Sequence, residues 1–267
     1  MITVAIVNQK GGVGKTTTAV NLAAWFAARK VRTLLIDFDV QGHAARSLGM
    51  EKGAGLYRWL VEGEPVESVA IEARPWLHLV TSDKTTERIK LFMQTEIGRE
   101  YAIGQRLEFD ARRYDLVVLD LAPGSDVLHV GALVASDYFI IPAKLDFLAL
   151  DGVVEVIRTV RSLGSLRLVE PPALIGALPT MYDRSTMETR GNLERLREAL
   201  GSAELVLPPI PMDTKIREAS SYGKTVWEYA PTCAGAIGYE AASDAPNRLG
   251  RVGGYEHLGE IVERVLR

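Results

Sequence analysis

Short apolar runs alternate along this chain with longer stretches in which apolar residues recur every three or four positions. Continuous apolar runs are typical of strands that are buried on both faces. The predicted strands cover residues 2–7, 33–36, 77–80, 116–119, 138–141, 173–178 and 205–207. The helical spacing covers residues 16–29, 126–135, 150–162 and 186–200. This alternation predicts an α/β fold with a mostly parallel, twisted sheet that helices cover on both faces.

The C-terminal part departs from this alternation. Residues 233–254 are rich in Gly and Ala, and we expect an irregular insertion there before a last helix. That helix has an apolar stripe with helical spacing, formed by Leu258, Ile261, Val262, Val265 and Leu266. Because its polar face is not basic, we expect it to pack on the core and not on a membrane. The chain shows no internal repeat or low-complexity linker, so we expect one domain over residues 1–267.

Composition narrows the classes of function. The 267 residues carry 31 Lys and Arg against 34 Asp and Glu, a formal net charge of −3. Bulk charge therefore does not attract nucleic acid, and any DNA contact needs a local patch. The single cysteine, Cys233, excludes a disulfide framework and a Cys-rich zinc site. No apolar run approaches the roughly 18 residues of a membrane helix, and the N-terminus lacks the basic start of a signal peptide, so we expect a cytoplasmic protein.

The strongest chemical signal is a glycine-rich turn between the first predicted strand and the first predicted helix. It reads Gln9, Lys10, Gly11, Gly12, Val13, Gly14, Lys15, Thr16 and Thr17. Glycines let successive backbone N–H groups point inward at a phosphate, and the helix N-terminus adds partial positive charge. Lys15 is predicted to reach the β- and γ-phosphates of a nucleotide, and the Thr16 hydroxyl to bind Mg²⁺. Gln9 stands where the usual pattern has glycine, and Lys10 is a second lysine beside the loop.

Carboxylates follow two of the predicted strands. Asp120 ends the apolar run 116–119, where an acid suits a magnesium ion held through water. Asp37 and Asp39 follow the run 33–36, and strand alternation predicts both on one face of the strand end. We expect at least one of this pair near the metal or near the attacking water.

Taken together, these segments resemble the ParA family of DNA-partitioning ATPases. That family belongs to the deviant Walker A group of P-loop NTPases, which also holds MinD and the nitrogenase iron protein. The similar blocks come in the family's order and cover residues 10–17, 37–42, 114–124, 135–143, 179–184, 210–213 and 221–225. The resemblance therefore covers nearly the whole chain, and a P-loop NTPase fold is expected.

The resemblance implies an ATP-driven switch in which two subunits enclose two ATP molecules. Lys10 matches the lysine that reaches the phosphates of the other subunit, and Asp39 matches the water-activating aspartate, which also lies near the metal. Thr16 matches the direct Mg²⁺ ligand and Asp120 the Walker B acid. Residues 10–17 match the phosphate-binding loop. Adenine recognition in the family falls on positions that match Thr180, Met181, Pro211, Met212 and Asp213.

The resemblance also implies partners. Family members in the ATP dimer bind double-stranded DNA without sequence preference, on the nucleoid, and a ParB-like protein stimulates hydrolysis and releases them. Such a cycle segregates chromosome or plasmid DNA. The basic positions that match the family are Lys215 and Arg217, yet residues 183–224 carry seven basic and seven acidic side chains. Met212 stands where many members have arginine, and His43 where they have asparagine.

One alternative stays open. A MinD-like or other positioning ATPase has the same ATPase core, and its ATP dimer docks on a protein or membrane surface instead of DNA. The polar face of the last helix disfavours a membrane. The near-zero local charge of residues 183–224 leaves a protein surface and DNA both possible. Four scattered histidines show no metal-ligand spacing, so no metal site beyond Mg²⁺ is expected.

Overall fold

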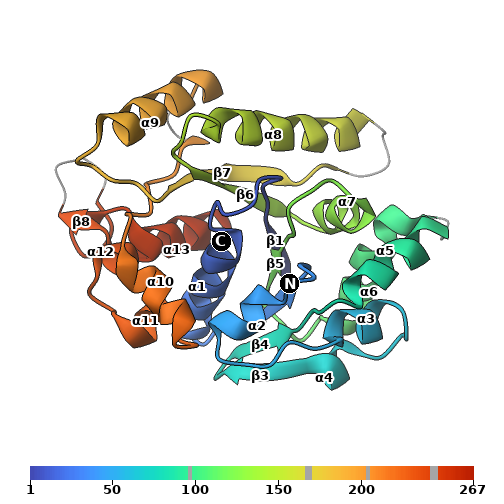
Figure 1. Cartoon of the computed structure of the whole chain (residues 1–267). Coiled ribbons are helices and arrows are strands. Elements are labelled where there is room, and N and C mark those ends of the chain that lie inside the picture. Colours follow the sequence, from blue (N-terminus) through green and yellow to red (C-terminus); the bar gives the residue numbers. More distant parts are fainter. Residues whose placement is uncertain (96–97, 166–169, 203–204, 241–245) are drawn as a thin grey trace.

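The computed structural model of the chain describes residues 1–95, 98–165, 170–202, 205–240 and 246–267. Seven strands form one sheet in the order β3-β4-β2-β5-β1-β6-β7, parallel except for β3 at one edge (Figure 1). The strands are β1 (Ile2–Ile6), β2 (Thr33–Asp37), β3 (Ala70–Arg74), β4 (Leu77–Val80), β5 (Leu116–Asp120), β6 (Tyr138–Lys144) and β7 (Ala173–Thr180). The predicted fold class is confirmed.

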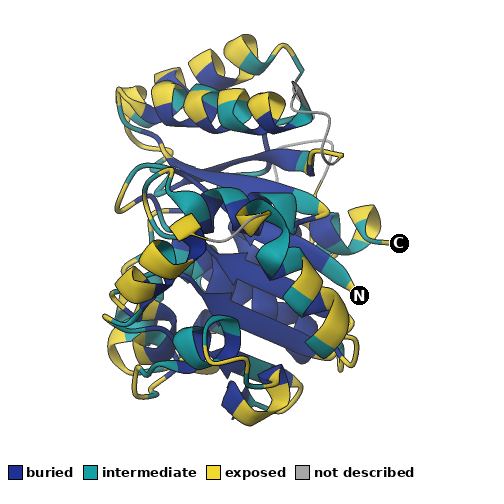
Figure 2. Cartoon of the chain, turned by 90° about the vertical axis from the view of Figure 1, so that its right-hand side faces the viewer, coloured by how far each residue is buried: buried dark blue, intermediate teal, exposed yellow. Residues whose placement is uncertain are grey.

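Helices cover both faces of this sheet, and each face has its own apolar core. One face packs on α1 (Lys15–Ala27), α2 (His43–Ser47), α10 (Thr214–Ser221), α11 (Val226–Tyr229), α12 (Ala234–Ile237) and α13 (Gly254–Val265). The other packs on α3 (Gly55–Leu60), α4 (Val66–Val69), α5 (Thr86–Thr95), α6 (Ala102–Asp110), α7 (Val127–Val134), α8 (Ala149–Ser165) and α9 (Met187–Leu200), and a 3₁₀ turn, Arg99–Tyr101, precedes α6. Figure 2 shows the buried strands between the outward-facing, exposed sides of these helices.

Two strand predictions differ from the structure. Residues 205–207 form no strand in the described part of the chain, but a single bridge from Val206 to Ala177. Pro208 and Pro209 follow and remove the backbone donors that a longer ladder needs. Strand β3 was not predicted, because an edge strand with one solvated face carries charged residues such as Glu72 and lacks a continuous apolar run.

The insertion is more ordered than predicted. Instead of an irregular excursion, it contains α12 and a two-stranded sheet of β8 (Tyr239–Glu240) and β9 (Arg251–Val252), while residues 241–245 lie outside the described residues. Glycines allow its close backbone approaches. Gly254 has φ of 74°, and a Cβ atom there would lie 2.4 Å from the backbone nitrogen of Gly238. Arg248 of the insertion also forms an ion pair with Glu256 of α13.

The last helix packs on the core, as predicted. Leu258 and Val262 of α13 are buried against α1, whereas Val265 is exposed. The buried Glu256 carboxylate accepts from the Trp25 indole at 2.8 Å and pairs with Arg29 at 3.0 Å. No helix of the described residues is long and apolar enough to cross a membrane.

The register of the central strands places the candidate site residues at one edge of the sheet. Ile6 of β1 pairs with Asp120 of β5, and Asp120 pairs in turn with Asp37 of β2. Because all three strands are parallel, their carboxyl ends lie at one edge of the sheet. Ligands bind at this edge in open α/β folds. The loop between β1 and α1 starts at the same edge.

The contact between α13 and α1 gives the first prediction. A Cβ atom on Gly259 would lie 2.3 Å from the Trp25 ring, so Gly259→Ala forces the two helices apart. We expect this substitution to lower the free energy of unfolding by about 1–3 kcal/mol, the usual cost of overpacking. Chemical denaturation followed by circular dichroism measures it.

The matched control is Gly191→Ala in α9, where an added Cβ meets nothing within 4 Å. Replacing a mid-helix glycine by alanine stabilises a helix by roughly 0.5–1 kcal/mol. Equal unfolding free energies for Gly259→Ala and the unmodified protein would contradict the packing argument.

Candidate functional site

The glycine-rich loop curls around the N-terminus of α1. Gly12 and Gly14 have φ of 71° and 90°, the left-handed region that glycine adopts without strain. Asn8 holds the start of the loop, since its amide donates to the carbonyl of Pro142 at 2.8 Å and its oxygen accepts from the backbone of Lys10 at 2.9 Å. Helix α1 begins at Lys15 without a side-chain cap. Its first N–H groups are therefore available to a phosphate.

Both lysines of the loop donate to backbone carbonyls. Lys15 is only 6% exposed, and its ammonium donates to the carbonyl of Lys10 at 2.7 Å. Burial lowers the pKa of Lys15, and the charges of Asp120 and Asp39 oppose that shift. The Lys10 ammonium donates to the carbonyl of Leu148, in the turn before α8. Each lysine thus has a weak neutral partner that an anion can replace.

The two acids at the end of β2 and just beyond it, Asp37 and Asp39, have different surroundings. The strand ends at Asp37, so Asp39 lies in the following turn and strand alternation does not fix its direction. Asp37 is fully buried, and its carboxylate accepts from the backbone N–H groups of Asp39 at 2.8 Å and Ala44 at 3.0 Å. Burial is the main reason that the pKa of Asp37 is raised, to about 7. Asp37 therefore shapes the loop that carries Asp39.

Asp120 is the least satisfied polar group of the site. It is fully buried, and neither carboxylate oxygen has a hydrogen-bond partner among the described residues. Burial and then the charge of Asp37 raise its pKa well above the ordinary range, while the nearby Thr16 hydroxyl, which does not reach ordinary hydrogen-bond geometry, and the charge of Lys15 lower it. A buried, unpaired carboxylate is costly unless a cation or a donor compensates it. The donor set of Asp120, Asp39 and the Thr16 hydroxyl consists of hard oxygens and fits Mg²⁺.

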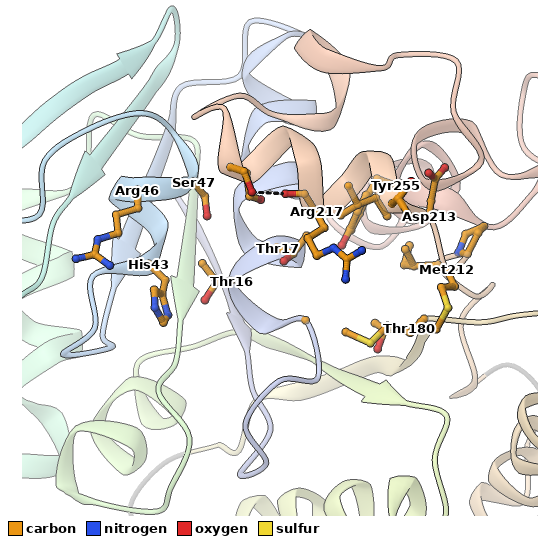
Figure 3. Close-up of a pocket in the computed structure, with 18 residues that line it drawn as sticks. Thr16, Thr17, His43, Arg46, Ser47, Thr180, Met212, Asp213, Arg217 and Tyr255 are labelled. Carbon is orange, nitrogen blue, oxygen red and sulfur yellow. Dashed lines mark hydrogen bonds between the residues drawn. The ribbon is translucent and has the colours of Figure 1, made fainter.

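A cavity of about 580 Å³ opens beside the phosphate loop (Figure 3). It is lined by residues from the phosphate loop and α1, α2, the end of β7, the segment 210–221 and α13. They are Gly14, Thr16, Thr17, His43, Arg46, Ser47, Thr180, Met181, Ile210, Pro211, Met212, Asp213, Thr214, Ile216, Arg217, Ser220, Ser221 and Tyr255. The volume is ample for a nucleoside.

The structure brings the five predicted adenine residues together on one side of this cavity. Thr180 donates from its hydroxyl to the carbonyl of Val13 at 2.9 Å, which ties the end of β7 to the phosphate loop. Met181 has φ of 54°, a left-handed conformation that only a few per cent of non-glycine residues adopt. The backbone of Met212 donates to the carbonyl of Tyr182 at 2.8 Å, which fixes residues 211–213 alongside. That these residues contact adenine stays a prediction.

The two predicted DNA residues lie in different surroundings on α10. Lys215 pairs with Glu218 at 2.7 Å and lies over the Tyr229 ring. Arg217 lines the cavity instead (Figure 3). His43, Arg46 and Tyr255 also line the cavity, and the sequence did not predict this role for them. His43 had a signal, since it stands in the block that follows Asp39, but nothing in the sequence joins Tyr255 to the phosphate loop.

Known proteins share this fold and these segments. A family model described as an AAA domain matches residues 1–167. The chromosome-partitioning ATPase Soj of Thermus thermophilus is 35% identical over 243 residues, which cover 90% of this chain and 93% of that protein. These findings agree with the ParA resemblance that the sequence motifs gave.

Solved structures agree with the sequence relatives. The structure of apo McdA from Cyanothece superposes with a TM-score of 0.79 at 20% identity, over 87% of this chain and 94% of that one, and so shows the fold alone. Cobyrinic acid a,c-diamide synthase from Mycobacterium smegmatis, with a bound ATP analogue and magnesium, is 29% identical, with a TM-score of 0.73 over 84% of this chain and 91% of that one. The chain belongs to the ParA/MinD family of P-loop ATPases.

Proposed function

We propose that this protein is a partition ATPase of the ParA type, which hydrolyses ATP and segregates or positions chromosome or plasmid DNA. The observation that carries the proposal is the pair of buried charges beside the phosphate loop, Lys15 and Asp120. Each is held without an opposite charge in hydrogen-bond contact among the described residues. Such a pair is costly on its own and suits a site that binds a nucleotide with its cation.

ATP is the substrate, and this chain's residues have separate tasks in holding it. The backbone N–H groups of residues 11–17 bind the phosphates, and Lys15 exchanges its loop carbonyl for the β- and γ-phosphates. Thr16, Asp120 and Asp39 would hold Mg²⁺, which neutralises phosphate charge when bound. Asp39 accepts a proton from the attacking water or orients it. Thr180, Met181, Pro211, Met212 and Asp213 enclose the adenine.

Dimerisation completes the site. Lys10 leaves the carbonyl of Leu148 and reaches the phosphates of a second subunit, where its charge stabilises the transferring phosphoryl group. A cation supplied by the partner acts only in the assembled dimer. Hydrolysis is therefore coupled to assembly, as a switch requires.

DNA is the proposed track of the ATP dimer, in the cytoplasm and on the nucleoid. Double-stranded DNA binds without sequence preference through basic residues that two subunits align, with Lys215 and Arg217 as the candidates. A ParB-like partner stimulates hydrolysis and releases the dimer. The relatives named as chromosome-partitioning ATPases support this choice.

A second candidate is a positioning ATPase whose ATP dimer docks on a protein or membrane surface. The ion pair between Lys215 and Glu218 favours it, because this acid neutralises one of the two basic residues that DNA would need. No long apolar helix occurs in the described part of the chain, so membrane docking would need an amphipathic surface.

The first test traps the ATP dimer. Asp39→Ala leaves Lys10, Lys15 and Thr16 in place, so ATP still binds, while hydrolysis falls by about 100-fold or more. The trapped dimer should cosediment with nonspecific duplex DNA in ATP but not in ADP. Because phosphate contacts release counterions, binding should weaken steeply, by about tenfold or more, between roughly 0.1 M and 0.3 M salt. A trapped dimer that ignores DNA would refute the partition function and turn the search to a protein surface.

The second test separates nucleotide binding from assembly. Lys10→Ala removes the charge supplied to the partner, so we expect a monomer with ATP and a loss of hydrolysis of about 10³-fold. Nucleotide affinity should change by less than about threefold, because Lys15 still holds the phosphates. Analytical ultracentrifugation and a phosphate-release assay measure these effects.

The control is Lys30→Ala, which removes an exposed lysine just after the C-terminal end of α1, the opposite end of that helix from the phosphate loop. It should dimerise and hydrolyse ATP as the unmodified protein does. If Lys10→Ala also dimerises with ATP and turns over normally, Lys10 has no role across the interface.

A further inference from the structure

Arg217 reaches into the nucleotide cavity from α10. Figure 3 shows its side chain extending from the helix toward the space between Thr17 of α1 and Thr180 of β7. All three residues line the same cavity. The guanidinium therefore lies between the phosphate-loop side and the side that holds the predicted adenine residues.

Among the residues that the structure describes, the guanidinium of Arg217 makes no hydrogen bond or ion pair. The Ser221 hydroxyl donates to the backbone carbonyl of Arg217 and leaves the side chain free of that contact. Lys215, two residues earlier on the same helix, pairs with Glu218. An arginine with five free donors at a cavity wall is suited to a phosphate or carboxylate ligand.

The carboxylate nearest along the wall does not neutralise Arg217. Asp213 is the acid among the cavity-lining residues, and its two oxygens accept from the backbone N–H groups of Lys215 at 2.9 Å and Gly235 at 3.0 Å. Those bonds lower the pKa of Asp213 against the effect of its partial burial. Asp213 is thus committed to holding α10 against α12, and the positive charge of Arg217 is left for a ligand.

The position of the Arg217 guanidinium within the cavity indicates which part of a nucleotide it contacts. If the phosphate loop holds the β- and γ-phosphates and the far wall holds the base, the α-phosphate and ribose lie between them, beside Thr17. We propose that Arg217 is a nucleotide-contacting residue whose guanidinium donates to the phosphate of ATP or ADP nearest Thr17. This inference rests on the proposed nucleotide site. It differs from the DNA role that the family resemblance predicts for Arg217.

The contact also links the nucleotide to helix α10 at the surface. Helix α10 packs against α2 and α11, and its other basic residue, Lys215, faces away from the cavity in its pair with Glu218. A phosphate bound by Arg217 holds α10 in one orientation. Lys215, on the other side of the helix, then keeps one orientation while nucleotide is bound.

The test compares nucleotide affinities of the unmodified protein, Arg217→Gln and Arg217→Lys by isothermal titration calorimetry with ATP, ADP and adenosine in Mg²⁺. A guanidinium bond to a phosphate predicts that Arg217→Gln raises the Kd of both ATP and ADP by about tenfold or more. The Kd of adenosine should stay within about twofold. Arg217→Lys keeps the charge without the planar fork, so its loss should be smaller.

Arg197→Gln is the matched control, since Arg197 lies on α9 in an exposed pair with Glu194 and away from the cavity. Its nucleotide affinities should be unchanged, and thermal unfolding without nucleotide checks that every variant folds. Unchanged ATP and ADP affinities in Arg217→Gln would overturn the inference, and so would an equal loss for adenosine. If Arg217→Gln keeps its full nucleotide affinity but no longer binds DNA, Arg217 is a DNA-binding residue and the inference is wrong. Failure of the unmodified protein to bind any nucleotide would refute the proposed function itself.

Discussion

The parallel pairing of β1, β5 and β2 is the constraint on which the rest of the structure depends. Its register sets Ile6 beside Asp120 and Asp120 beside Asp37, so one strand end leads into the phosphate loop and the other two end in acids. A shift by one residue would turn Asp120 to the opposite face of the sheet. The buried, aliphatic character of these strands prevents such a shift, because it would also displace two apolar cores.

This arrangement leaves opposite charges close together but not joined. Lys15 donates to a loop carbonyl, and Asp120 has no hydrogen-bond donor in the described part of the chain. The burial of each group therefore costs free energy that no direct ion pair offsets. Burial disfavours the charged form of each group, so it lowers the pKa of Lys15 and raises the pKa of Asp120. A nucleotide with its cation would supply an anion for Lys15 and a cation for Asp120 at once.

The cavity beside the loop depends on contacts between distant segments. Thr180 bonds to the phosphate loop, Met181 takes a left-handed conformation at the end of β7, and residues 211–213 run alongside through the bond from Met212 to Tyr182. Helix α13 closes the cavity with Tyr255, and the Gly259 contact with Trp25 sets how near that helix comes to α1. The site is therefore held by the C-terminal packing as well as by the loop.

The sequence by itself determined six of the seven strands, the phosphate loop and the place of Asp120 at a strand end, because these depend on local patterns: apolar runs, glycines at fixed offsets and an acid after a strand. It also fixed the family, since the motifs occur in the order found in its relatives. Tertiary structure alone decided that Asp37 accepts hydrogen bonds from the loop after β2, that Arg217 faces the cavity and that Tyr255 lines it. Those outcomes depend on which side of a helix or turn meets a segment far away in the chain, and no local pattern records that meeting.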